Sequence, residues 1–450
     1  MAALVLVAAG AWVAAATLLW RSSVPHGLRL PDVDLRAIFS EAELSQAARF
    51  ARFERVFWVL SQVALVAVLA VYAARGARFA RESAAGPIGT GMLLGMLGFA
   101  LVWVVQVPFQ LASLWWERRY GVSSAGYLDW LVEGWFGLGA EFLFLCLALL
   151  IVMALARVMG DRWWLAGGPA FVGLAALFLL VSPYLLPETH RLDDPALLAD
   201  ARAYEEAEGT GPIRIDVEVV SDDTEAANAM ALGLGPTRRI VLWDTLLEFP
   251  HAEASFVLAH EIAHHSRDHL PKGLAWYALF AVPGAWAIAR TTRRRGGMRD
   301  PLAVPLSLLV LVVLQLAALP LENVIGRRME AEADWVALER ARNPDAARGA
   351  FRRFTVDSLS EPSPPAWAYV LLAGHPTIEQ RLAMIEAWDV RQATSAAQSP
   401  PPVPGRRALA GRSPATPASR RWPRSGRGPV PPALFPRPPL ASGAPGTGGA

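Results

Sequence analysis

The feature that most constrains this chain is a series of apolar runs long enough to cross a membrane. A helix needs about 20 consecutive, mostly apolar residues to span the hydrocarbon core of a bilayer. The first run has no positively charged segment before it, which favours an uncleaved membrane anchor over a secretory signal. The sequence predicts seven spans in all: Ala2–Trp20, Val56–Ala74, Gly91–Leu111, Leu138–Ala156, Trp164–Leu186, Gly273–Ala289 and Leu302–Leu321.

The composition agrees with a membrane protein. Apolar residues make up 54% of the 450 residues and charged residues only 18%, whereas soluble domains carry about 25% charged residues. No basic stretch interleaved with aromatic residues suggests binding of nucleic acid. The single cysteine, Cys146, excludes an intramolecular disulfide. The predicted surroundings are therefore the lipid bilayer, and in a prokaryote a multi-pass protein of this kind would lie in the cell membrane.

The spans and the polar segments between them divide the chain into five parts. Two polar segments are long enough to form a small α+β domain together, and a Pro- and Arg-rich tail without acidic residues follows them. Such a tail buries too little apolar surface to fold and is predicted to be disordered. The parts are a five-span region (1–186), the first half of the polar domain (187–271), two spans (272–321), the second half of the polar domain (322–392) and the tail (393–450).

Periodicity predicts the elements of the polar domain. Asp193–Gly209 reads as a helix, and alternating apolar residues favour strands at Ile213–Val220 and Arg239–Trp243. Pro250 suits the first turn of a following helix, which Leu270 and Pro271 are expected to end. After the last span, residues 323–342 are again helical by composition.

The helix after Pro250 carries the motif His-Glu-Ile-Ala-His, residues 260–264. Residues four apart lie on one face of a helix, so His260 and His264 can share one metal ion. Glu261 is offset by one position and can lie beside the ion without binding it. Two neutral imidazoles on Zn²⁺, with a carboxylate that takes a proton from the metal-bound water, are what a zinc hydrolase needs. The plain alternative is a polar helix face.

A third protein ligand is expected, because catalytic zinc sites commonly have three and a water. Glu330 is chemically suitable for this role, and Asp334, on the same helix face, can accept the free N–H of a ligand histidine and fix its tautomer. The alternative for Glu330 and Asp334 is an ordinary solvated charge stripe on an amphipathic helix.

Several motifs together resemble those of the type I CAAX prenyl proteases, a membrane branch of the HExxH zinc metallopeptidases. The resemblance covers residues 2–388 and excludes the tail. Gly326 replaces the usual Ser of this family, and Thr377 replaces a common Pro. The motifs, in chain order, are WWERRYGVSS (115–124), NAMALGLGPTRRIVLWDTLL (228–247), HEIAHHSRDH (260–269), NVIGRRMEAEAD (323–334) and GHPTIEQRLAMIE (374–386).

The resemblance implies a gluzincin-like domain that holds one Zn²⁺ per chain. It makes His260, His264 and Glu330 the zinc ligands, Glu261 the catalytic base, and Asp334 a residue that supports a ligand. It also implies an edge strand over Asn228–Leu232, in which Asn228, Ala229 and Met230 bind an extended substrate by main-chain pairing. Arg327 and His375 are expected to reach towards the scissile carbonyl or the product carboxylate; for each, a helix-capping or ion-pair role is the alternative.

The predicted function is therefore zinc-dependent hydrolysis of peptide bonds, with Glu261 assisting the attack of zinc-bound water. The substrate is a peptide or protein that is membrane-associated or lipidated, and the resemblance points to prenylated chains ending in a CAAX sequence. Two alternatives stay open. One is a general quality-control protease of the membrane without CAAX specificity. The other is a non-catalytic scaffold with a structural zinc site, for which His269 is the nearby fourth ligand, although its direction relative to His260 is poor.

Two features of the sequence predict opposite orientations in the membrane. Arginine-rich loops at residues 75–86, 157–162 and 290–299 would be cytoplasmic by the positive-inside rule, which places the metal motif outside. The family resemblance implies the reverse, with the metal domain facing the cytoplasm.

Overall fold

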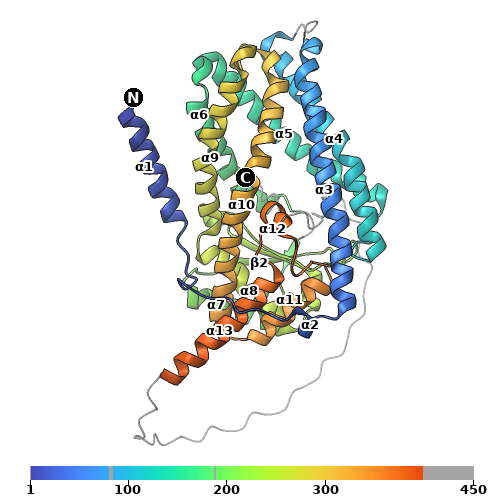
Figure 1. The fold of residues 1–450 in the computed structure, drawn as a ribbon, viewed down its shortest axis with the longest axis vertical. Helices are drawn as coiled ribbons and strands as arrows, with labels where there is room; N and C mark the ends of the chain where they lie inside the picture. The colour runs from blue at the N-terminus through green and yellow to red at the C-terminus, as the bar shows by residue number, and fades with distance from the viewer. Residues whose placement is uncertain (1, 81–84, 187–188, 399–450) are drawn as a thin grey trace, which may run out of the picture.

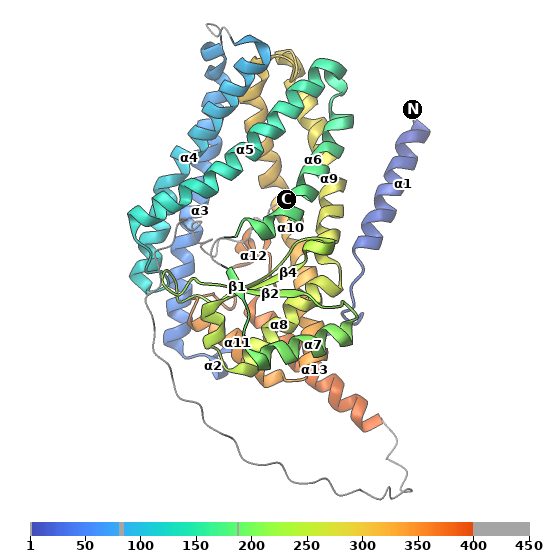
Figure 2. The ribbon, with the colours of Figure 1, turned by 180° about the vertical axis from the view of Figure 1, so that it is seen from behind.

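The computed structural model describes residues 2–80, 85–186 and 189–398. Long helices run side by side through one half of the molecule, and a small sheet wrapped by shorter helices forms the other half (Figures 1 and 2). The long helices are α1 (Ala2–Leu19), α3 (Glu41–Arg75), α4 (Gly86–Tyr120), α5 (Tyr127–Met159), α6 (Trp164–Val181), α9 (His269–Thr292) and α10 (Val304–Ala341).

Within the described residues, five helical segments are long and apolar enough to cross a membrane. The first and sixth predicted spans form the helices α1 and α9, which are not among these five segments, so the count of seven stays a prediction. An integral membrane protein is supported. The five segments are Glu41–Arg75, Gly86–Tyr120, Phe142–Arg162, Trp164–Tyr184 and Pro301–Ala341.

Glycines allow the membrane helices to approach one another closely. Gly91 and Gly95 of α4 face Met153 and Leu149 of α5, and a Cβ atom at either glycine would collide with those side chains. Small residues commonly occupy such interfaces, because helix association in lipid depends on close van der Waals packing.

The second half of the molecule is built on a four-stranded sheet of order β1-β2-β4-β3. The strands β2 and β4 are parallel, while β1 and β3 pair antiparallel with their neighbours. The structure therefore confirms the two strands predicted from periodicity, contains the edge strand that the resemblance implies, and adds one short strand. The strands are β1 (Thr189–Arg191), β2 (Arg214–Glu218), β3 (Ala229–Leu232) and β4 (Arg239–Trp243).

Helix α8 is the centre of the core beside this sheet. The side chains of Leu258 and Ile262 on α8, Ile240 and Leu242 on β4, and Phe351 are all at most 2% exposed. Burial of each such side chain stabilises the fold by roughly 1.5–3 kcal/mol. The helices of this half of the molecule are α2 (Leu35–Ile38), α7 (Pro195–Glu208), α8 (His251–Ser266), α11 (Pro344–Val356), α12 (Ala366–Leu372) and α13 (Ile378–Gln398).

The boundary between α8 and α9 differs from the prediction. The helix α8 ends at Ser266, and Asp268 takes a left-handed conformation with φ 54°. Pro271, which was expected to end the metal-binding helix, instead lies in the first turn of α9, where its missing N–H has no partner to lose. The chain therefore turns between the metal motif and the following helix.

The helix α10 joins the two halves of the molecule. Its 38 residues correspond to about 57 Å at 1.5 Å per residue, and it passes from an apolar segment through Pro320 into the polar domain. The last helix, α13, continues to Gln398, past the predicted start of the tail at residue 393. Residues 399–450, to which most of the predicted disorder belongs, lie outside the described residues.

Candidate metal centre

Two imidazoles on α8 form the base of the candidate site. His260 is buried and His264, one turn further on, is half-buried; their Nε2 atoms lie 3.0 Å from each other. The helical spacing therefore brings two potential ligand atoms to one point, as the motif predicts.

The helix α10 brings a carboxylate to the same point. Glu330 Oε2 lies 3.2 Å from His260 Nε2, and Glu330 Oε1 lies 3.5 Å from His264 Nε2. The Glu330 side chain is 15% exposed. Two imidazole nitrogens and one carboxylate thus converge from two helices, which is a donor set that zinc prefers.

The surrounding charges favour a cation at this point. Burial alone would lower the pKa of His260, but hydrogen bonds to Asp334 and Glu330 raise it to about 10. Burial alone would raise the pKa of Glu330, but His375, His264 and His260 hold it well below its usual range. Glu330 Oε2 is also buried without a well-directed hydrogen-bond donor. These residues fit a zinc ion, whose charge would satisfy the carboxylate and both nitrogen lone pairs.

Asp334 and Arg381 hold His260 in place from behind. Asp334 Oδ1 accepts a hydrogen bond from His260 Nδ1 at 2.9 Å, which leaves Nε2 free to face the centre. Arg381 donates from Nε to Asp334 Oδ2 at 2.8 Å and from Nη2 to Oδ1 at 2.6 Å. The position of Asp334 agrees with the predicted supporting role. No role for Arg381 was predicted from the sequence, although this residue lies in the late motif at residues 374–386.

Glu261 lies beside the two histidines. One ligand atom each of His260, Glu261 and His264 all lie within 4.8 Å of one another. Burial raises the pKa of Glu261 to about 7, and the backbone of Ala231 on β3 hydrogen-bonds to its carboxylate. Glu261 is thus poised between the metal centre and the edge strand.

The strand β3 is at one edge of the sheet, as predicted. It pairs with β4 on one side only, with Met230 opposite Val241. Asn228 precedes the strand; its carbonyl accepts from Trp243 N at 3.0 Å, and its Oδ1 accepts from Ala229 N at 2.9 Å. Residues alternate in an antiparallel ladder, so Asn228 and Met230 bond to β4, whereas the backbone of Ala229 and Ala231 faces the open edge.

His375 and Arg327 occupy different positions relative to the centre. His375 Nε2 lies 3.1 Å from Glu330 Oε2, and its side chain is 63% exposed. Arg327 is 9% exposed and donates from Nη1 to the carbonyls of Tyr369, at 2.8 Å, and Ala373, at 2.5 Å. The structure therefore brings His375 to the centre. It places the Arg327 guanidinium against the end of α12 and the residue that follows it, just before His375.

Two further buried histidines lie next to the centre. His265 Nε2 donates to the carbonyl of Arg239 on β4 at 3.1 Å. His269 turns towards the far nitrogen of His264 and not towards the point where the ligand atoms meet. Spacing alone could not assign either residue, because the turn at Asp268 separates His269 from the helix that carries the motif.

Comparisons with known proteins agree with this geometry. Residues 207–389 match the family described as Peptidase family M48, and this segment contains all three predicted ligands. The chain is 27% identical over 296 residues to an uncharacterized metalloprotease, YhfN, of Bacillus subtilis (strain 168). The aligned segment covers 62% of this chain and 69% of that protein. The crystal structure of S. mikatae Ste24p is similar with a TM-score of 0.67 and 18% identity, over 84% of this chain and 96% of that chain.

These findings confirm the predicted resemblance to the type I CAAX prenyl proteases. The similarity to the solved structure shows a shared fold, and the two sequence matches support a metalloprotease. Together with the five apolar segments, they support a membrane metalloprotease that acts on a peptide or protein and uses a metal.

Proposed function

We propose that this membrane metalloprotease is a zinc endopeptidase with His260, His264 and Glu330 as the ligands of one Zn²⁺ per chain. The observation that carries the proposal is the convergence of the two Nε2 atoms and the Glu330 carboxylate beside Glu261. When bound, zinc supplies a Lewis acid that polarises the scissile carbonyl and lowers the pKa of water.

Glu261 is the general base in this proposal. Its carboxylate takes a proton from the attacking water and later delivers the proton to the leaving amine. Burial raises its pKa to about 7, and the charge of a bound metal would lower that pKa, so the carboxylate is ionised near neutral pH and can accept a proton. Asp334 keeps His260 in the tautomer that presents Nε2 to the centre.

His375 and Arg327 take the remaining roles. The exposed ring of His375, beside Glu330, donates a hydrogen bond to the oxygen on which charge develops. Arg327 positions His375, because it holds the carbonyls of Tyr369 and Ala373, and the loop from Ala373 leads directly to His375.

The substrate lies extended along β3, over Asn228, Ala229 and Met230. The outward backbone of Ala229 offers hydrogen bonds that do not depend on substrate sequence, and Ala231 on the same edge contacts Glu261. The helix α9 begins at His269, immediately after α8, and α10 continues from an apolar segment into the site. A chain held at the membrane by a lipid group would reach a site placed in this way, so we propose lipidated or membrane-associated substrates, including prenylated CAAX ends.

The experiment is cleavage of two peptides, one prenylated with a CAAX end and one casein-like, by the purified full chain with and without a chelator. We expect Glu261→Gln to retain one zinc per chain and to lose activity by about 10²–10⁴-fold, the usual contribution of a positioned base. Glu248→Gln, at an exposed glutamate before the same helix, is the control and should cleave normally.

Each outcome has a distinct meaning. Wild-type cleavage by Glu261→Gln would refute Glu261 as the base. Stoichiometric zinc without cleavage of either peptide would favour the scaffold alternative. Equal cleavage of both peptides would favour a general quality-control protease of the membrane, and selective cleavage of the prenylated peptide would favour CAAX processing.

A further inference from the structure

A chain of hydrogen bonds leads from His264 away from the metal centre to the segment that follows α1. His264 Nδ1 lies 3.0 Å from His269 Nδ1, and His269 Nε2 lies 3.2 Å from Glu332 Oε2. Glu332 Oε1 accepts from both the backbone N and the Oγ of Ser23, each at 2.7 Å. Glu332 is on α10, two positions after Glu330, but its carboxylate faces the other way.

The carboxylate at the end of this chain determines where each proton lies. An ionised carboxylate only accepts hydrogen bonds, so His269 Nε2 must carry the proton that faces Glu332. A neutral imidazole donates from one nitrogen and accepts at the other, so His269 Nδ1 accepts. His264 Nδ1 must then donate, and its Nε2 presents a lone pair to His260 Nε2 and Glu330.

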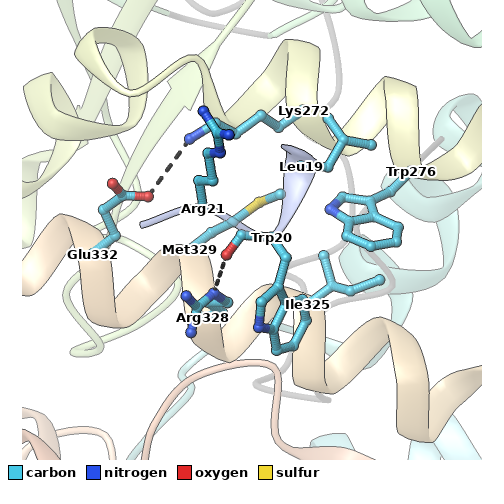
Figure 3. A pocket seen from close by; sticks show the side chains of 9 residues that line it. All are labelled: Leu19, Trp20, Arg21, Lys272, Trp276, Ile325, Arg328, Met329 and Glu332. Atoms are coloured by element: carbon cyan, nitrogen blue, oxygen red, sulfur yellow. Dashed lines mark hydrogen bonds and ion pairs between the residues drawn. The ribbon is translucent and has the colours of Figure 1, made fainter. Parts of the chain in front are cut away.

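The two middle members of the chain, His269 and Glu332, are well buried. His269 is 4% exposed and Glu332 is 4% exposed. The Glu332 carboxylate also faces Lys272 Nζ at 3.6 Å, beside the small cavity lined by Trp20 and Trp276 that Figure 3 shows. Its negative charge is thus fixed by three neighbouring groups, and it cannot turn away without breaking several contacts.

We propose that His269 and Glu332 are positioning residues that fix the tautomer and ring orientation of the zinc ligand His264, with Ser23 anchoring Glu332. The arrangement matches the support that Asp334 gives to His260, except that an additional imidazole bridges the longer distance to the carboxylate. The inference rests on the proposed function, because it takes His264 to be a zinc ligand.

The test is the zinc affinity of the full chain, measured by competition with a chelating dye. Supporting partners of ligand histidines typically contribute 10–100-fold to metal affinity, so His269→Leu should weaken zinc binding by about that factor. His269→Gln keeps an acceptor and a donor and should recover part of the loss. The visible spectrum of the Co²⁺-substituted protein should change in His269→Leu, because a change in the orientation of the His264 ring changes the ligand field at the cobalt ion.

His265→Leu is the matched control. His265 is 5% exposed, and its replacement by leucine also removes one hydrogen bond, to the carbonyl of Arg239. That bond does not involve the side chain of a proposed ligand. We expect His265→Leu to lower the thermal unfolding temperature about as much as His269→Leu while zinc affinity changes by less than about threefold. Equal effects of the two leucine variants on zinc affinity would overturn the proposal, because any buried substitution would then suffice.

A second variant keeps the test decisive if His269→Leu does not fold. Glu332→Gln retains the shape of the side chain but makes a weaker acceptor, and we expect a loss of several-fold in zinc affinity. Unchanged affinity and an unchanged Co²⁺ spectrum in Glu332→Gln would refute the proposal. Failure of the wild-type protein to bind zinc would instead refute the proposed function, so the two failures are distinguishable.

Discussion

Glu261 accepts a proton only when its carboxylate is ionised, so activity should fall as pH falls through its pKa. Burial raises that pKa to about 7 without a metal, and the charge of zinc lowers it towards the ordinary value of about 4.3. We expect the acid limb of kcat/KM between about pH 4.3 and 7. A pH profile of peptide cleavage measures this, and an acid limb above pH 7 would contradict the assignment.

Asp334 supports both a proposed ligand and a buried guanidinium. It is 1% exposed and pairs with Arg381, so Asp334→Asn leaves Arg381 without its counter-charge. We expect up to about 3–5 kcal/mol of destabilisation, together with a 10–100-fold loss of zinc affinity. Thermal unfolding and dye competition measure the two effects. Asp345→Asn, at a 91% exposed partner of Arg348, should change neither by much.

At the scale of residues, the candidate ligands could be predicted from their spacing along a helix and from the family resemblance. Helical periodicity brings His260 and His264 together, and the resemblance adds Glu330, which the structure places 3.2 Å from His260 Nε2. The supporting contacts of Arg381 and His269 could not be predicted, for a physical reason. Their partners, Asp334 and His264, are on other elements, so only the tertiary fold shows the contacts.

At the scale of elements, the open edge of β3 carries the prediction about substrate. Ala229 N faces away from β4 and donates to Asn228 Oδ1, so Ala229→Pro should leave the ladder intact, lose that local bond and remove one donor that a substrate could take over from Asn228. One hydrogen bond contributes about 1 kcal/mol, or about fivefold in binding, so KM should rise several-fold at nearly constant stability.

Met230→Pro is the contrasting variant. Met230 lies opposite Val241 in the ladder, so a proline there removes a bond that holds the strand to β4. We expect a lower free energy of unfolding, measured by denaturant titration. If Ala229→Pro cleaved an extended peptide with the wild-type KM, the edge of β3 would not be the binding site.

Element prediction succeeded where the pattern was long and failed where it was short or where the turn was unusual. The amphipathic helix at residues 193–209 is α7, with Asp194 as the N-cap and Gly209 in the left-handed region at its end. The three-residue strand β1 has no pattern long enough to detect. Pro271 was wrongly expected to end a helix, because a left-handed aspartate, which is uncommon, makes the turn instead.

At the scale of the whole molecule, the described parts of the three arginine-rich connections (75–80 and 85–86, 157–162, 290–299) lie at the end opposite the metal centre (Figures 1 and 2). Arg293 contacts Asp161 at 3.0 Å, and Arg295 contacts the carbonyl of Ala73. The two ends of the bundle should therefore face opposite sides of the membrane. In a Cys146→Ser background, we expect cysteines at Arg294 and Glu206 to react with an impermeant label from opposite sides.

This labelling also decides between the two orientations. The resemblance predicts that Glu206, in the metal domain, faces the cytoplasm, and the positive-inside rule predicts that Arg294 does. Labelling of both positions from the same side of intact cells would contradict the arrangement of the spans. The sequence alone could not decide the orientation. The charge of the loops indicates which connections share one side of the membrane, but the positive-inside rule and the family resemblance disagree about which side is cytoplasmic.

The continuous helix α10 has a mechanical consequence. The helix begins among the packed membrane helices, passes through Pro320 and holds Glu330 towards its other end. A transmembrane rod tilts when the hydrocarbon layer becomes thinner, and that tilt would swing the glutamate relative to the imidazoles on α8. The rate of cleavage in vesicles of graded acyl-chain length should therefore pass through a maximum, so that the enzyme acts as a gauge of bilayer thickness.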